Sequence, residues 1–235
     1  MEKWGIIGGT FDPIHLAHIY IAEEAKKQLD LQKIIFMPAG SPPHKTDKRI
    51  TKASFRLNMI KAAIEGKEGF EVSDYEIKED GMSYTYKTLK AFYKENREIF
   101  FITGADCLMN LEKWRKVDTI LKLCNFVVFT RPGYDRENLL KQKKFIEDKY
   151  RAKIIFLNIE GKDISSTEIR KLILQHKDLG KYLPDKVIDI IDKEKLYRGE
   201  NNDEAWRSIW IFKRNLKRKK VSSYFRRDFC GKEIS

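Results

Sequence analysis

The chain has 235 residues and a formal net charge of +12, and its 42% hydrophobic and 35% charged residues suit a globular protein with one substantial core. It contains no run of 18 apolar residues and no apolar leader segment, which excludes a membrane-spanning protein and predicts a cytoplasmic one. Its three cysteines, Cys107, Cys124 and Cys230, are odd in number, widely spaced and without a Cys-x-x-Cys pair, which fits a reducing compartment better than a disulfide framework.

The first predicted element is a strand from Trp4 to Ile7, and residues 8–18 follow it as Gly-Gly-Thr-Phe-Asp-Pro-Ile-His-Leu-Ala-His. The two glycines let the backbone approach a ligand closely, while Asp12 and Pro13 predict the N-cap and the first residue of a helix. A strand, a tight turn and a helix start in succession direct backbone N–H groups and the positive end of the helix dipole at one place. A phosphate is the natural occupant.

Two histidines strengthen this prediction. His15 and His18 are three residues apart, so on a helix they share a face and can donate to the same anion. The stretch resembles the signature of the nucleotidyltransferase superfamily of Rossmann-like adenylyltransferases, whose helix-borne His-x-Gly-His motif binds ATP phosphates. Ala17 stands in place of the motif glycine. Alanine fits this position if the backbone is helical, but not if the position requires a positive φ. A metal site at the two histidines, or two surface histidines beside an incidental turn, remain as alternatives.

The helix from Pro13 to about Leu29 and a strand at Ile34 to Met37 complete a predicted βαβ unit. A Gly-Ser-Pro-Pro-His-Lys loop follows, and its Pro-Pro-His-Lys part narrows the resemblance to bacterial nicotinate-nucleotide adenylyltransferase. In that family the loop lies over the nucleotide site, which makes His44 and Lys45 candidate substrate-binding residues. A rigid solvent loop is the alternative.

The next segment is predicted as a helix from Ala53 to Ile64, with Arg56 as a solvated charge, and then a strand from Phe70 to Ile77. A Ser-Tyr-Thr-Tyr stretch leads into another helix. In the family this stretch helps hold the nicotinate carboxylate, and Thr85 is the position that the resemblance assigns to it. Capping of the helix by Ser83 or Thr85 explains the same residues without a ligand.

A continuous apolar run from Glu98 to Thr103 predicts a central parallel strand. Gly104 and Asp106 follow at its carboxyl end, where open α/β sheets bind ligands, and they match the adenosine-contacting segment of the family. Trp114 lies in a pattern of helical spacing, so it is either a core residue or, as in the family, the ring that stacks on the pyridine of the substrate. Arg115 stands where the family commonly has a tyrosine.

Phe126 to Thr130 predicts another buried strand, and Arg131 after it is suited to charge-assisted contacts with phosphate. A lysine-rich helix over residues 136–149 and a strand from Ile154 to Leu157 come next. The sequence then reads Asp-Ile-Ser-Ser-Thr-Glu-Ile-Arg at residues 163–170.

In this last motif Ser165 and Glu168 predict a capping box and hence the start of a helix. Together with Thr167 and Arg170 it resembles the superfamily signature that binds the outer phosphates of ATP. We therefore expect the helix starts near residues 13 and 166 to meet in space around one triphosphate. The predicted fold is α/β and Rossmann-like, a mostly parallel sheet with helices on both faces.

The resemblance implies a nucleotidyltransferase domain over residues 1–199 that transfers the adenylyl group of ATP, with Mg²⁺, to nicotinate mononucleotide and has no resident metal site. It implies catalytic roles for His15, His18 and Arg170. It implies ATP-binding residues in several segments, namely Gly8, Gly9, Thr10, Phe11, His15, His18, Gly104, Asp106, Arg131, Ser165, Ser166, Thr167 and Arg170. The implied substrate-binding residues are His44, Lys45, Thr85, Trp114 and Arg115. A phosphopantetheine or nicotinamide mononucleotide acceptor is the alternative.

The remaining residues, 200–235, form a basic extension that contains aromatic residues. Residues 201–235 hold ten Lys or Arg against four Asp or Glu, so they carry half of the net charge. A nucleic-acid patch and a membrane-surface helix are the functional interpretations, and a solvated appendage is the one we favour. The sequence predicts no membrane partner and leaves the oligomeric state open.

Overall fold

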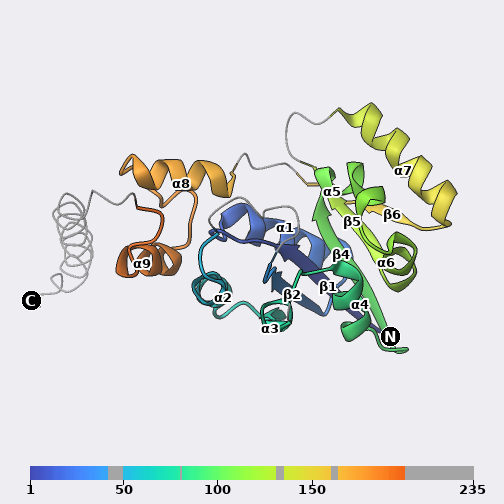
Figure 1. The fold of residues 1–235 in the computed structure, drawn as a ribbon, viewed down its shortest axis with the longest axis horizontal. Coiled ribbons are helices and arrows are strands. Elements are labelled where there is room, and N and C mark those ends of the chain that lie inside the picture. The colour runs from blue at the N-terminus through green and yellow to red at the C-terminus, as the bar shows by residue number, and fades with distance from the viewer. Residues whose placement is uncertain (42–49, 80, 131–134, 160–163, 199–235) are drawn as a thin grey trace, which may run out of the picture.

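The structure is a computed structural model that describes residues 1–41, 50–79, 81–130, 135–159 and 164–198 (Figure 1). Predictions for His44, Lys45, Arg131 and the basic extension lie outside these residues. Within them, no helix is long and apolar enough to cross a membrane.

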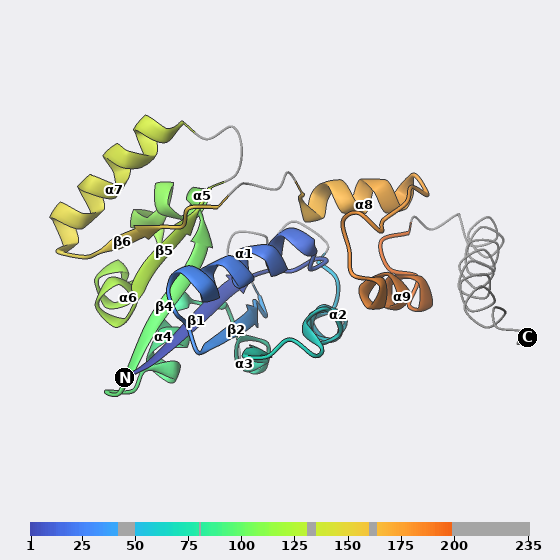
Figure 2. The ribbon, with the colours of Figure 1, turned by 180° about the vertical axis from the view of Figure 1, so that it is seen from behind.

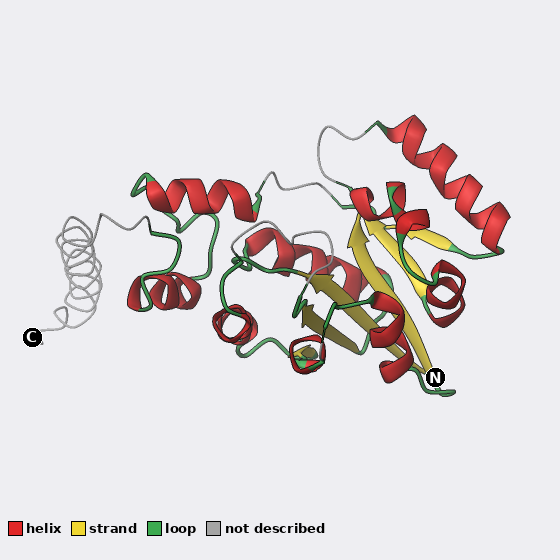
Figure 3. Cartoon of the chain, viewed as in Figure 1, coloured by secondary structure: helices red, strands yellow, loops and turns green. Residues whose placement is uncertain are grey.

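The described residues form one six-stranded sheet in which every neighbouring pair of strands is parallel (Figure 3). The strands are β1 (Glu2–Gly9), β2 (Lys33–Pro38), β3 (Phe70–Val72), β4 (Arg97–Gly104), β5 (Asn125–Phe129) and β6 (Ile154–Phe156). Their order is β3-β2-β1-β4-β5-β6, the doubly wound arrangement of dinucleotide-binding folds. The predicted parallel α/β fold is confirmed.

Helices cover both faces of this sheet (Figures 1 and 2). They are α1 (Leu16–Gln28), α2 (Ala53–Ile64), α3 (Tyr75–Lys78), α4 (Thr85–Phe92), α5 (Ala105–Met109), α6 (Val117–Leu123), α7 (Arg136–Tyr150), α8 (Ser166–Leu174) and α9 (Asp185–Lys193), with a short 3-10 helix at Leu111–Lys113. Side chains alternate along each strand, so Ile7 joins the core under α1, α2, α8 and α9, whereas Ile6 joins the core under α4 to α7.

Apart from α1, whose start is described with the site below, two predicted elements are wrong in their extent. The strand expected from Phe70 to Ile77 stops at Val72, because the chain turns at Asp74 and enters α3. The helical pattern around Trp114 is broken: a 3-10 helix ends there, and α6 begins only after Lys116, whose φ of 59° is left-handed. No glycine or proline marks that break in the sequence.

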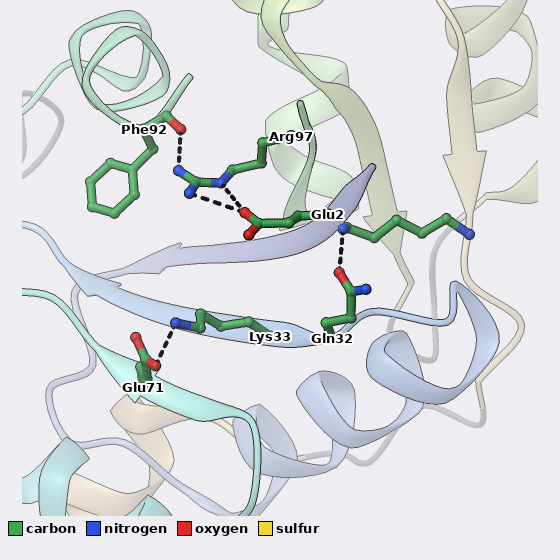
Figure 4. A network of polar contacts seen from close by, with 7 residues as sticks. Glu2, Gln32, Lys33, Glu71, Phe92 and Arg97 are labelled. Atoms are coloured by element: carbon green, nitrogen blue, oxygen red, sulfur yellow. Dashed lines mark hydrogen bonds and ion pairs between the residues drawn. The ribbon is translucent and has the colours of Figure 1, made fainter. Parts of the chain in front are cut away.

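At the amino ends of the central strands, a polar network joins β1, β4 and the last residue of α4 (Figure 4). The Arg97 side chain is 6% exposed; its Nη2 lies 3.2 Å from Glu2 Oε2, and its Nη1 donates to the Phe92 carbonyl at 2.8 Å. Its guanidinium carbon lies 3.3 Å from the centre of the Trp4 ring. Contacts of these three kinds stabilise the sheet edge opposite the one where ligands bind in such folds.

We expect Arg97→Ala to lower the free energy of unfolding by about 2 kcal/mol, since hydrogen bonds to a charged group and a cation–π contact are lost together. The activity of the folded protein should not change, because β4 separates Arg97 from the other edge by roughly 20 Å at the usual rise per residue. Urea unfolding and steady-state kinetics below the transition test both statements. A loss of turnover without a loss of stability would contradict the prediction.

Candidate functional site

The site is built where the strand order of the sheet reverses. β1 and β4 are neighbours there, and their carboxyl ends carry Gly8, Gly9 and Gly104 side by side at one edge. Chain segments leave this edge in opposite directions, toward β2 on one side and β5 on the other. In open α/β sheets the crevice at such a reversal receives the ligand, so the topology selects the same residues that the sequence did.

The turn after β1 differs from its prediction. The first helix begins at Leu16 with His15 as N-cap, so Asp12 is not the cap and Pro13 is not the first helical residue. The reason is that the Asp12 carboxylate has other donors: it accepts hydrogen bonds from Tyr197 Oη at 2.6 Å and from the backbone N–H of Thr51 at 3.3 Å. The Asp12 carboxylate thus binds residues that are distant in sequence and does not cap the helix as the local pattern predicted.

Phe11 explains the second glycine of the turn. It is 2% exposed with a positive φ of 50°, and its ring folds back over the end of β1. A Cβ on Gly9 would lie 3.1 to 3.3 Å from that ring, closer than most packed side chains, so the ring would have to shift slightly. The same ring packs edge-on against His18, with centroids 5.0 Å apart. Gly9 therefore makes room for Phe11, and Phe11 supports His18.

The two histidines lie together at the beginning of α1. Their rings are stacked with centroids 3.6 Å apart, and His15 is 1% exposed while His18 is only half-buried. The backbone N–H of His15 donates to His18 Nδ1 at 3.3 Å, so the neutral form of His18 carries its proton on Nε2, which is then a donor. Ala17 is buried within the first turn of α1 and has no positive φ, so the motif alanine fits its backbone.

The beginning of α8 lies directly against the turn after β1, beside the beginning of α1 (Figure 2). Ser166 Oγ donates to the Pro13 carbonyl at 2.9 Å, and Arg170 Nη1 donates to the Asp12 carbonyl at 2.7 Å. Arg170 Nη2 also donates to Thr167 Oγ1 at 3.3 Å. The predicted meeting of two helix starts more than 150 residues apart in sequence is confirmed.

The predicted cap of α8 is present. Ser165 is the N-cap, and its Oγ accepts from the backbone N–H of Glu168 at 3.1 Å. Thr167 is exposed in the first turn, where the helix has unpaired N–H groups. Two helix starts, a guanidinium and an imidazole thus border one edge of the sheet, an arrangement suited to binding a polyanion.

Arg56 is the largest departure from prediction. It is 1% exposed rather than solvated, and its guanidinium donates to three backbone carbonyls, those of Thr51 at 2.9 Å, Thr10 at 2.8 Å and Ala39 at 2.8 Å. These carbonyls belong to the segments after β1, after β2 and before α2. Burial lowers the pKa of the Arg56 guanidinium, and the nearby Asp12 carboxylate opposes that effect. Arg56 therefore ties three loops of the site together.

On the other side of the site, Ser83 holds the segment after β2. Its Oγ accepts from the backbone N–H groups of Gly40 at 3.0 Å and Ser41 at 3.3 Å, so it does not cap α4. Thr85, the other predicted cap, is the first residue of α4, which has Tyr84 as N-cap. A Cβ on Gly40 would lie 2.1 Å from the Glu76 carbonyl oxygen, which explains glycine there.

The predicted substrate residues Thr85, Trp114 and Arg115 come from two segments that the structure brings together. The Arg115 guanidinium carbon lies 5.3 Å from the centre of the Tyr84 ring, directly before Thr85 at the start of α4. Trp114 is half-buried and packs edge-on against Phe101, so part of the ring joins the core. A helix start, a guanidinium and aromatic rings suit a planar acidic ligand.

Comparison with known proteins identifies the family. The cytidylyltransferase-like family model matches residues 6–172. The protein named "Probable nicotinate-nucleotide adenylyltransferase" of Clostridium botulinum strain Eklund 17B is 54% identical over 200 residues, which cover 85% of this chain and 100% of that one. The chain belongs to the nicotinate-nucleotide adenylyltransferase family. A Clostridium novyi protein of the same name is 52% identical over 200 residues, covering 84% of this chain and 100% of that one.

Solved structures of nicotinate-nucleotide adenylyltransferases support the fold. The Plasmodium falciparum nicotinic acid mononucleotide adenylyltransferase complexed with NaAD superimposes with a TM-score of 0.67 and 25% identity. The match covers 84% of this chain and 98% of that one. The chain therefore has the whole fold of its family, followed by the basic extension.

Sequence reasoning about this adenylyltransferase missed Arg56, Ser83 and Tyr197 as site-supporting residues. Arg56 carried a signal, since it precedes Met59 and Ile60 by three and four residues and so lies on the buried face of α2. Ser83 was noticed but given another role. Tyr197 carried no signal, because only the fold places it beside Asp12.

Proposed function

We propose that the chain transfers the adenylyl group of ATP to nicotinate mononucleotide, giving deamido-NAD and pyrophosphate in NAD biosynthesis. The 54% identity to a protein of that name over 200 residues carries the choice of acceptor. The contact between the start of α8 and the turn after β1 supports the binding of ATP, because two helix starts that lie together suit one polyanion.

The reaction joins two anionic reactants, so its difficulty is electrostatic. A phosphate oxygen of the mononucleotide attacks the α-phosphorus of ATP in line, the bond from that phosphorus to the bridging oxygen breaks, and pyrophosphate leaves with the electron pair. No protein nucleophile is needed, since the attacking oxygen already carries charge. Catalysis then comes from alignment and from donors placed where charge develops.

We assign the donors by position. His15 and His18 lie at the start of α1 and contact the transferring phosphate, with Gly8, Gly9, Thr10 and Phe11 forming the turn beneath it. Arg170 and Thr167 at the start of α8, with Ser165 and Ser166, hold the departing pyrophosphate. Gly104 at the end of β4 and Asp106 in α5 contact adenosine, and Arg131, outside the described residues, adds a charge to the phosphates.

We assign the acceptor to the other side of the site. Thr85 at the start of α4 binds the carboxylate of the pyridine, and Trp114 and Arg115 border the ring. His44 and Lys45, outside the described residues, complete this part of the proposal. ATP enters with Mg²⁺, which prefers phosphate oxygens and water as ligands and neutralises the triphosphate charge. The exposed carboxylate of Asp106 at the same edge of the sheet suits such a complex.

The cellular setting is a proposal of the same kind. Cys107 and Cys124 are unpaired, and burial raises the pKa of Cys124 to about 12, which makes it a poor nucleophile at neutral pH. We infer a cytoplasmic protein, since unpaired thiols are typical of that reducing compartment.

Product analysis tests this function. We expect ATP with nicotinate mononucleotide to give equimolar deamido-NAD and pyrophosphate, with kcat/KM about tenfold or more above that for nicotinamide mononucleotide, because a charged ligand at a helix start binds more strongly than a neutral one. Chromatography of products from both acceptors and from phosphopantetheine measures it. Turnover of phosphopantetheine without turnover of either mononucleotide would show that the chain has another adenylyltransferase activity.

A further inference from the structure

The turn that follows α9 reaches back to the nucleotide site. Tyr197 Oη donates to Asp12 Oδ1 at 2.6 Å, across 185 residues of sequence. The turn itself is anchored on α9: Leu196 N–H donates to the Ile191 carbonyl at 3.0 Å, and Arg198 pairs with Asp192 at 2.9 Å, both side chains being no more than 10% exposed. The neighbours of Tyr197 on both sides are therefore fixed to α9, while its hydroxyl points at the site.

Asp12 links Tyr197 to the phosphate-binding side chains. It is 7% exposed, and its carboxylate accepts from Tyr197 on one oxygen and from the Thr51 N–H on the other. Its backbone carbonyl accepts from Arg170 at 2.7 Å, and the next carbonyl, that of Pro13, accepts from Ser166. The position of Asp12 thus sets the position of the acceptors on which the start of α8 rests.

We propose that Tyr197 is a positioning residue of the adenylyl transfer: by fixing the carboxylate of Asp12 it sets where Arg170 meets the ATP phosphates. The inference rests on the proposed function, since it assumes that Arg170 contacts those phosphates. The hydroxyl of Tyr197 contacts the Asp12 carboxylate, and the backbone carbonyl of Asp12 contacts Arg170, so its effect on Arg170 passes through Asp12. A displacement of a guanidinium by about 1 Å is enough to lower the rate of a reaction that depends on alignment.

The chemistry of the pair suits this role. Burial and the adjacent Asp12 carboxylate raise the pKa of the Tyr197 phenol far above its usual value, so the hydroxyl stays protonated at any working pH. A phenol that donates to a carboxylate makes a short and strong hydrogen bond. The Tyr197 hydroxyl is therefore available as a donor to Asp12 near neutral pH.

The test removes one oxygen atom from the full chain. We expect Tyr197→Phe to lower kcat about tenfold and to weaken binding of α,β-methylene-ATP about fivefold, with the KM of nicotinate mononucleotide unchanged within about twofold, as misplacement of Arg170 requires. Tyr182→Phe is the matched control, a half-buried tyrosine of the same core. It should leave kcat and ATP-analogue binding at the wild-type values.

A double-mutant cycle separates positioning from general stabilisation. If Tyr197 acts through Arg170, adding Tyr197→Phe to Arg170→Lys should lower kcat by less than about twofold more, because the shared interaction is already lost. Independent tenfold losses, or a loss of stability in urea with normal kcat, would overturn the proposal. Calorimetry with α,β-methylene-ATP needs no acceptor, so it tests the role of Tyr197 independently of the reaction. If the wild-type protein makes no deamido-NAD, the proposed function is rejected, whereas the calorimetric result still decides the role of Tyr197.

Discussion

His18→Ala is expected to lower kcat by about 10²- to 10³-fold, the usual cost of removing one donor from a site that stabilises developing charge. His18 Nδ1 already accepts from the His15 N–H, so Nε2–H is the donor that remains for the transferring phosphate. The half-buried ring lies at the start of α1, where its charge-stabilising effect adds to that of the helix.

The same change should cost little stability. The ring supplies one capping contact at 3.3 Å, a stacking contact with His15 and an edge-on contact with Phe11, together about 1–2 kcal/mol. Steady-state kinetics at saturating ATP and nicotinate mononucleotide, with urea unfolding in parallel, measure the two effects. An alanine variant within threefold of wild type in kcat would remove His18 from the reaction.

Two further variants make that experiment specific. His18→Gln keeps an N–H donor without an imidazole, so we expect at least about tenfold more activity than in the alanine variant if a neutral donor suffices. His176→Asn is the control: His176 follows α8 with a φ of 56°, a left-handed conformation that asparagine tolerates. Its kcat should match wild type.

Local sequence signals were sufficient for most of the sheet and for the motif that starts α8. The apolar run of β4 and the helix α2 have the predicted positions, since each depends on side-chain periodicity within one segment. The cap at Ser165 was likewise readable, because its partner Glu168 lies three residues away. Predictions held where the deciding contacts were close in sequence.

The site features that were mispredicted were set by contacts between distant segments. Asp12 has the residue type of an N-cap, yet Tyr197 and Thr51 engage its carboxylate and the helix starts at Leu16. Arg56 looked like an ordinary helix charge, because the carbonyls that bind it lie in loops up to 46 residues away. Buried polar groups of the site are satisfied by tertiary partners, and a single sequence does not show which partner will reach them.

Arg56→Ala is expected to lower the free energy of unfolding by about 3–5 kcal/mol, the range seen when one member of a buried charged network is removed. Three carbonyls lose their donor at once, and the buried Asp12 carboxylate loses a nearby positive charge. Because whole domains are stable by only about 5–15 kcal/mol, this variant should unfold at a much lower urea concentration.

Arg56→Lys separates charge from geometry. Lysine keeps the positive charge near Asp12, but a single ammonium cannot reach carbonyls on the three loops that contain Thr10, Ala39 and Thr51, so we expect a loss of about 2 kcal/mol and lower kcat in the folded protein. Lys61→Ala, an exposed change on the same helix, should stay within about 0.5 kcal/mol of wild type. Equal losses in the free energy of unfolding for Lys61→Ala and Arg56→Lys would mean that the contacts of the Arg56 guanidinium with the loops add nothing to stability. A larger loss for Arg56→Lys would show that the guanidinium holds the loops of the nucleotide site in place.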